Sequence, residues 1–118
     1  MTDAAMLRHK GHEVASVRPT ERIAAVAEHL SRRRIGAVVV LDAAQQLLGI
    51  VSERDIVRAI AANGARALEM TAGQLMTRAL RTATPGTTVL EAMALMTEGR
   101  FRHLPVLRDN TLVGLISI

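Results

Sequence analysis

The chain has 118 residues, of which 49% are hydrophobic, so it can bury a core and is not a disordered linker. It contains no cysteine, which excludes disulfide scaffolds, thiol nucleophiles and thiolate zinc sites. Fifteen basic residues against eleven acidic ones give a net charge of +4 that suits anionic ligands, and Phe101 is the only aromatic residue, so a flat ligand must be held by aliphatic side chains and backbone.

The first half of the chain is predicted to run strand, helix, strand, strand, helix. Its elements are an extended segment at 13–18, a helix from Ile23, strands at 35–41 and 47–51, and a helix at 53–63. The extended segment precedes Pro19, because a proline disfavours helical geometry in the residue before it. Apolar residues at helical spacing from Ile23 predict an amphipathic helix, and Ser52 and Gly64 are the expected N-cap and stop of the second helix.

The second half repeats the first. The aligned pairs are Pro19 with Pro85, Ile23 with Val89, Arg34 with Arg100 and Ser52 with Ser117. The copy predicts an extended segment at 80–84, a helix from Val89, strands at 102–107 and 112–117, and a turn at 108–110. Thr88 and Glu91 have the spacing of a capping box. Each repeat is one supersecondary unit, so two are expected to stack.

These segments resemble a tandem pair of cystathionine-β-synthase (CBS) domains, also called a Bateman module. The resemblance is carried by residues 34–42 and 49–58 in the first half and by 75–77, 99–106 and 114–117 in the second. It covers about residues 10–118 and implies an α+β fold of two β-α-β-β-α repeats, at 10–66 and 67–118, packed as a pseudo-two-fold pair. It also implies a stand-alone regulatory protein that forms a homodimer.

One departure from the family pattern concerns the end of the second repeat. In the family a Gly-Asp pair and a closing helix follow the second Gly-h-h-Ser motif (h, hydrophobic), whereas this sequence stops at Ile118. The second repeat therefore lacks its last helix and its ribose-binding aspartate. We expect the apolar sheet face left exposed to be covered by a partner chain or by another segment.

The first candidate site lies where a strand meets a helix at Ser52-Glu53-Arg54-Asp55. Unpaired N–H groups at a helix N-terminus suit a phosphate, Arg54 could reach the phosphate chain, and a carboxylate can accept hydrogen bonds from both hydroxyls of a ribose. Spacing alone favours a plain capping box between Ser52 and Asp55. The resemblance favours a binding site, because CBS sites take their ribose-binding aspartate here.

The resemblance assigns further ligand-binding residues around the two prolines. Thr84 and Arg18 precede Pro85 and Pro19, at the family position that approaches base and phosphate. Val89 and Ile23 occupy the aliphatic position that packs against the base.

The family pattern combines residues of one repeat with the pre-proline segment of the other. The more complete site would use Ser52, Arg54, Asp55, Thr84 and Val89, and the second would use Ser117, His103, Arg18 and Ile23 without an aspartate. The first is therefore expected to bind nucleotide more tightly. His103 is either a basic residue facing phosphates or a packed, hydrogen-bonded histidine, and Ala37 occupies its place in the first repeat.

The sequence thus predicts a non-catalytic sensor of AMP, ADP or ATP that needs no cofactor and acts on an unidentified effector protein. The alternatives are a structural dimerisation module with a vestigial cleft and, less favoured because stacking aromatic residues are absent, a nucleic-acid binder. We expect no enzyme, because the sequence shows no activated nucleophile, no metal constellation and no phosphate-binding Gly-rich loop. His9 and His12 are interpreted as surface residues, since no third metal ligand is spaced to join them.

The expected location is the cytoplasm, without membrane contact. No apolar run reaches the roughly 20 residues of a membrane-spanning helix. The first eight residues lack the basic-then-apolar order of a signal peptide.

Overall fold

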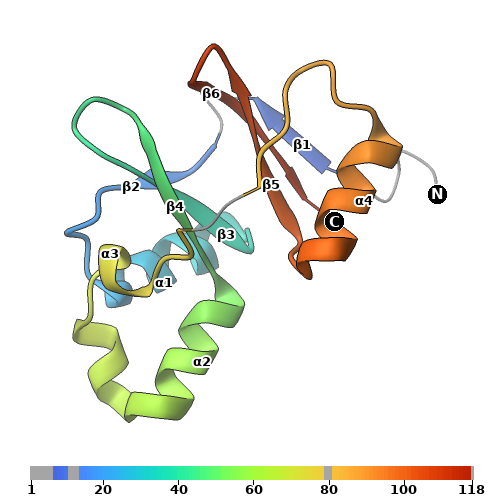
Figure 1. Ribbon diagram of the computed structural model, residues 1–118. Coiled ribbons are helices and arrows are strands. Elements are labelled where there is room, and N and C mark those ends of the chain that lie inside the picture. Colours follow the sequence, from blue (N-terminus) through green and yellow to red (C-terminus); the bar gives the residue numbers. More distant parts are fainter. Residues whose placement is uncertain (1–6, 11–13, 79–80, 118) are drawn as a thin grey trace. The chain divides into compact units, whose positions relative to one another are not determined.

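The computed structural model describes residues 7–10, 14–78 and 81–117 (Figure 1). Contacts within the chain define two compact units: a central unit, Ala15–Ala79, and a terminal unit made of Met1–Val14 and Leu80–Ile118. The terminal unit is discontinuous because its sheet includes strand β1 (Leu7–Lys10). This structural division differs from the two sequence repeats, 10–66 and 67–118, which stay a prediction.

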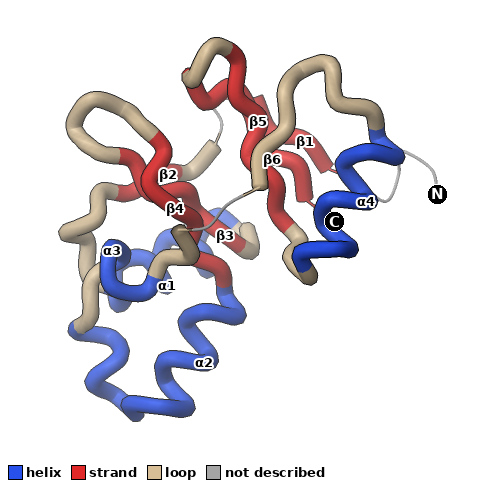
Figure 2. Tube along the Cα trace, viewed as in Figure 1, coloured by secondary structure: helices blue, strands red, loops and turns tan. Residues whose placement is uncertain are grey.

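The central unit is a three-stranded sheet with helices (Figure 2). Its strands, in sheet order, are β2 (Ser16–Val17), β3 (Ala37–Leu41) and β4 (Leu47–Ser52). Its helices are α1 (Ile23–Arg33), α2 (Glu53–Asn63), the 3₁₀ helix η3 (Gly64–Glu69) and α3 (Ala72–Leu75). β2 runs parallel to β3, with α1 as the crossover, and β3 runs antiparallel to β4.

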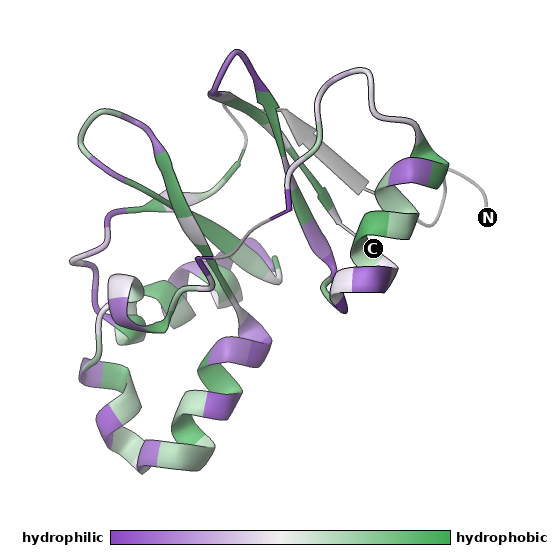
Figure 3. Cartoon of the chain, viewed as in Figure 1, coloured by the Kyte–Doolittle hydropathy of each residue, from purple (hydrophilic) through white to green (hydrophobic). Residues whose placement is uncertain are grey.

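The core of the central unit forms where α1 and α2 cover one face of this sheet. Apolar side chains at helical spacing on α1 meet alternate side chains of the strands. This cluster of buried residues includes Ile23, Val26, Leu30, Val38, Val40, Val51 and Ile56. Val39, which lies between Val38 and Val40 in the strand, is also fully buried. β3 is therefore apolar on both faces, as its continuous hydrophobic colouring shows (Figure 3).

The chain after α3 adds a short pairing to the outer edge of β4. Ile50 and Thr77 exchange two backbone hydrogen bonds, of 3.1 and 2.8 Å. A β-carbon at Gly49 would lie 2.7 Å from the Thr77 carbonyl oxygen, so this close approach of two backbones requires glycine.

The terminal unit is a sheet in the order β1, β6 (Thr111–Ser117), β5 (His103–Arg108), with helix α4 (Val89–Gly99). β6 is antiparallel to both neighbours. Asp109 and Asn110 form the β5–β6 turn with φ of 48° and 66°, as expected of a two-residue hairpin loop. Of the strand predicted at 80–84, residue 80 lies outside the described residues, and residues 81–84 form one parallel bridge, in which Ala83 pairs with Val106.

One face of the β5–β6 hairpin packs against α4, and the expected cover by a partner chain or by another segment stays a prediction. Leu104, Val106 and Ile116 are buried in a cluster with Ala92 and Met96 of α4. Within the described ranges, the exposed large hydrophobic residues lie in helices: Val57, Ile60, Leu68 and Leu90. α4 therefore covers this face of the β5–β6 hairpin.

The α+β fold is confirmed, and most predicted elements lie within a few residues of their observed bounds. Sequence analysis missed β1, η3 and α3. No helix in the described ranges is both long and apolar enough to span a membrane.

Candidate functional site at the start of helix α2

Ser52 and Asp55 form a reciprocal capping box where β4 ends and α2 begins. The Asp55 backbone N–H donates to Ser52 Oγ at 3.2 Å. In return, Asp55 Oδ2 accepts hydrogen bonds from the Ser52 backbone N–H at 2.8 Å and from Ser52 Oγ at 3.0 Å. The capping interpretation of this spacing is therefore confirmed as local geometry, and the box fixes the carboxylate at the helix start.

The same geometry leaves half of the Asp55 carboxylate available. Oδ1 has no hydrogen-bond partner among the described residues, and the side chain is only half-buried. An ionised carboxylate accepts hydrogen bonds at both oxygens. The box therefore holds Asp55 in one orientation while Oδ1 can accept from a ligand.

The start of α2 lies beside the beginning of β3. Ala37 pairs with Ser52 across the sheet, and the Glu53 N–H donates to the Gly36 carbonyl at 2.9 Å. Arg54 is exposed in the first turn of α2, next to the partial positive charge of the helix end. This end of the sheet therefore offers a cation, the positive end of a helix and a fixed carboxylate close together in the chain.

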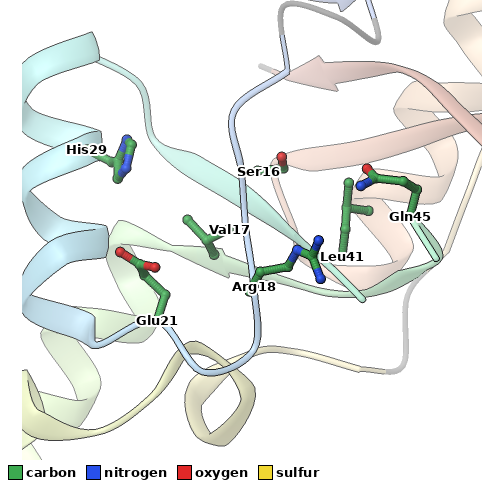
Figure 4. Close-up of a pocket in the computed structure, with 7 residues that line it drawn as sticks. All are labelled: Ser16, Val17, Arg18, Glu21, His29, Leu41 and Gln45. Atoms are coloured by element: carbon green, nitrogen blue, oxygen red, sulfur yellow. The ribbon is translucent and has the colours of Figure 1, made fainter. Parts of the chain in front are cut away.

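Arg18 lies elsewhere in the central unit, in a hollow of about 220 Å³ at the edge of β2 (Figure 4). The hollow is lined by Ser16, Val17, Arg18, Glu21, His29, Leu41 and Gln45. Glu21 and His29 lie on the side of α1, and Leu41 and Gln45 on the side of the β3–β4 hairpin. This volume is below the about 300–1,000 Å³ that is typical of small-molecule pockets.

Ile23, the aliphatic residue predicted to pack against a base, has an exposed fraction of 0% and belongs to the core cluster. Its counterpart Val89, at the start of α4, is only half-buried. The two equivalent positions therefore differ in what they present at the surface.

Thr84 begins a hydrogen-bonded turn before α4. Its N–H donates to Thr87 Oγ1 at 2.9 Å, and its own hydroxyl accepts from the Gly86 N–H at 3.3 Å. The turn leads to Thr88, the N-cap of α4. Thr84 is thus exposed and held by neighbours within three residues, close in sequence to Val89.

The Thr88–Glu91 capping box lowers the pKa of Glu91. The Thr88 backbone N–H donates to Glu91 Oε1 at 3.0 Å, and the Thr88 side chain adds a smaller effect in the same direction. Both favour the ionised carboxylate.

His103 and Ser117 are brought together as a cross-strand pair of β5 and β6. Both side chains are half-buried. Ser117 also pairs with Leu7 of β1, so it lies on the central strand of its sheet and not on an edge.

The structure therefore groups the predicted residues into local sets within each unit. Ser52, Arg54 and Asp55 lie together; Arg18 lines the β2 hollow and Ile23 lies in the core; Thr84 precedes Val89; and His103 pairs with Ser117. The predicted combination of these sets into two sites stays a prediction. The lining residues Glu21, His29 and Gln45 were missed, because they come from three separate segments with no common spacing.

Within the described residues, no group of three histidine or acidic side chains is placed to hold a metal ion. His12 lies outside the described residues, and the side chain of His9 does too.

Comparison with known proteins decides the family. The family model for the CBS domain matches residues 7–62 and 72–118. The chain belongs to the CBS-domain family. The tandem arrangement predicted from the sequence is thereby confirmed, and CBS pairs are regulatory modules that are generally non-catalytic.

Two curated relatives cover most of this chain. The mitochondrial CBS domain-containing protein CBSX3 of Arabidopsis thaliana is 41% identical over 93 residues, which are 75% of this chain and 45% of that protein. A 17.7 kDa protein of Acidianus ambivalens is 36% identical over 107 residues, 90% of this chain and 63% of that protein. The chain thus spans about half to two-thirds of their lengths.

Solved CBS-domain structures have the same fold. A CBS-domain containing protein of Agrobacterium tumefaciens has a TM-score of 0.85 and 41% identity, covering 88% of this chain and 78% of its own. A CBS domain protein of Pyrobaculum aerophilum, complexed with AMP, has a TM-score of 0.77 and 27% identity, covering 91% and 79%.

Proposed function

We propose that this CBS pair is a non-catalytic regulatory module that binds an adenine nucleotide (AMP, ADP or ATP), with Asp55 accepting hydrogen bonds from the ribose diol. The carrying observation is the fixed Asp55 carboxylate, whose Oδ2 is engaged by Ser52 while Oδ1 has no partner among the described residues. The Pyrobaculum aerophilum relative complexed with AMP supports the choice of ligand.

The remaining contacts are proposed from the resemblance. Arg54, Thr84 and Val89 would complete the Asp55 site, and Ser117, His103 and Arg18 would form a second site. Ligand binding shifts a conformational equilibrium only through its different affinities for the two states, so the module requires an effector protein that distinguishes those states.

Isothermal titration of the chain with AMP, ATP, NAD and S-adenosylmethionine tests this function. We expect heat for the adenine nucleotides and a loss of roughly tenfold or more in affinity for Asp55→Ala, because a charge-assisted hydrogen bond contributes over about 1.4 kcal/mol. Binding of AMP and ATP that is unchanged in Asp55→Ala, or no heat with any ligand, would contradict the proposal.

Two further variants separate ribose binding from helix capping. Asp55→Asn keeps a side-chain oxygen that can accept from the Ser52 N–H but loses the charge. This variant should therefore fold normally and bind nucleotide with lower affinity than the wild type. Gln74→Ala removes the equivalent contact from the Thr71–Gln74 capping box at α3. We expect Gln74→Ala to bind nucleotide like the wild type.

We also propose that two copies associate through the outer face of α2. Val57 and Ile60 lie three residues apart on this helix with exposed fractions of 65% and 42%, so they form an apolar strip. Val57→Glu should shift sedimentation toward monomer, whereas Leu90→Glu, at an exposed position on α4, should not. A dimer that persists in Val57→Glu would contradict this interface. If association is observed without nucleotide binding, the chain is a dimerisation module.

A further inference from the structure

Helices α1 and α4 end with the same backbone motif. In each, the residue after the helix donates its N–H three residues back, and the following residue donates five residues back, which defines a Schellman motif. The bonds are Arg34 N–H to Ser31 O (3.3 Å) and Ile35 N–H to Leu30 O (3.1 Å) in α1, and Arg100 N–H to Thr97 O (3.3 Å) and Phe101 N–H to Met96 O (3.1 Å) in α4.

Arginine occupies the left-handed position of both motifs. Arg34 has φ 53° and Arg100 has φ 58°, in the region where a β-carbon is disfavoured and glycine is the usual residue. The backbone would therefore be more stable with glycine at either place. Because arginine occupies the same strained position in both repeats, we infer that its side chain has a function there.

The fold makes no use of these two side chains. Both are exposed, and neither has a hydrogen bond or ion pair with another described residue. The nearby Arg32 differs, because it pairs with Glu28 one helical turn earlier. The guanidinium of Arg34 is therefore available to a ligand.

Arg34 stands beside the proposed nucleotide site within the central unit. It precedes Gly36 by two residues, and the Gly36 carbonyl accepts the Glu53 N–H from the start of α2 at 2.9 Å. The start of α2 also carries the cation Arg54 together with the acidic residues Glu53 and Asp55. Because Asp55 is assigned to the ribose, Arg34 and Arg54 are the cations offered to the phosphates.

We propose that Arg34 is a specificity-determining residue that binds the β- or γ-phosphate of a nucleoside di- or triphosphate, so that this module prefers ATP or ADP to AMP. The inference rests on the proposed function, since it needs a nucleotide at the start of α2. Guanidinium forms paired hydrogen bonds with phosphate, which gives arginine a reason to remain where glycine would stabilise the backbone.

Titration of the full chain with AMP, ADP, ATP and inorganic tripolyphosphate tests Arg34, together with thermal unfolding. Arg34→Gly should raise the melting temperature by roughly 3 °C or more, because it relieves the left-handed strain. It should also lower the affinity for ATP about tenfold, while the affinity for AMP stays within about twofold. Arg34→Asn, which tolerates this backbone without the charge, should lower ATP affinity equally. Arg66→Ala, an exposed arginine of η3 with the same change in net charge, should bind ATP like the wild type.

The outcomes separate this inference from the proposed function. If AMP binds with dependence on Asp55 and ATP affinity is the same in the wild type and Arg34→Gly, the assignment of Arg34 is overturned while the proposed function stands. If no nucleotide binds the wild type, both fail. Tripolyphosphate binding as tight as that of ATP would overturn the inference as well, because the nucleoside would then contribute nothing.

Discussion

Helices α1 and α4 are equivalent in the two repeats, yet they begin in different ways. α4 begins with its own capping box, in which Thr88 and Glu91 satisfy each other's backbone N–H groups. The N-cap of α1 is Arg22, whose side chain caps nothing in its own helix. Instead, the Ile23 N–H donates to the Met70 carbonyl at 2.8 Å, from a segment distant in the sequence.

Further hydrogen bonds join the start of α1 to the segment around α3. The Ala72 N–H donates to the Glu21 carbonyl at 2.8 Å, and the Gly73 N–H donates to the Pro19 carbonyl at 2.9 Å. The first N–H groups of both helices therefore find acceptors outside the helical hydrogen-bond pattern. In α4 the acceptors belong to the capping box itself, which we call the local route, and in α1 they come from a segment distant in the sequence, which we call the tertiary route. It follows that mutations in η3 and α3 should affect α1, whereas α4 should respond only to its own first turn.

Truncation of the first residue of each helix should show the largest difference. Ile23→Ala removes a fully buried side chain from the central core and should cost about 3 kcal/mol of unfolding free energy. Val89→Ala removes a smaller, half-buried side chain and should cost roughly 1 kcal/mol. Urea unfolding monitored by circular dichroism measures both. Equal costs would show that the two positions are packed alike, against the burial seen here.

Overpacking of α3 should come next and tests the tertiary route directly. Ala72 has an exposed fraction of 0% and contributes one of the hydrogen bonds to the start of α1. Ala72→Leu should therefore cost about 2 kcal/mol and increase hydrogen exchange at the Ile23 amide. Ala62→Leu, on the exposed surface of α2, is the control and should change stability by less than about 0.5 kcal/mol. Unchanged exchange at Ile23 in a destabilised Ala72→Leu would refute the coupling.

Removal of the two N-cap side chains should have a smaller effect on the unfolding free energy. Here the larger loss is expected in α4 and not in α1. Thr88→Ala should cost about 1 kcal/mol because the Glu91 N–H loses its acceptor at 3.1 Å. Arg22→Ala should cost less than about 0.5 kcal/mol, since among the described residues its guanidinium donates only to the exposed Glu69 carbonyl. Thermal unfolding of both variants measures these losses of stability. A larger loss for Arg22→Ala than for Thr88→Ala would mean that the Arg22 side chain stabilises the start of α1.

The elements that sequence analysis predicted most closely are those with local signals. α2 spans Glu53–Asn63 as predicted, because Ser52 and Gly64 mark its two ends within the helix itself. The Thr88–Glu91 capping box was predicted for the same reason. In contrast, β1 was missed because the strand with which it pairs, β6, lies at the other end of the chain. The same explanation applies to α3, whose role is to contact residues that precede α1.

The candidate site likewise has features that local spacing predicts and features that only the fold reveals. The Ser52–Asp55 box is a local pattern, so its spacing was sufficient to predict it. The partner-free Oδ1 of Asp55 and the left-handed backbone of Arg34 depend on three-dimensional packing, and no spacing indicates them. The β2 hollow likewise needed the fold, because Glu21, His29 and Gln45 approach one another only when α1 and the β3–β4 hairpin flank β2.

The smallest expected effect is the pH dependence of the local route. Hydrogen bonds from Thr88 lower the pKa of Glu91 in the folded state below its ordinary 4.5, so the ionised carboxylate stabilises the fold at neutral pH. This contribution should be lost as the pH falls below 4.5 and through the lowered folded pKa. The wild type should therefore exceed Glu91→Gln in melting temperature at pH 7, and the two should converge in acid. In a Thr88→Ala background the difference should shrink without vanishing, because the backbone N–H at position 88 still donates to Glu91. A gap between wild type and Glu91→Gln that widens in acid would show that the carboxylate is not stabilised in its ionised form.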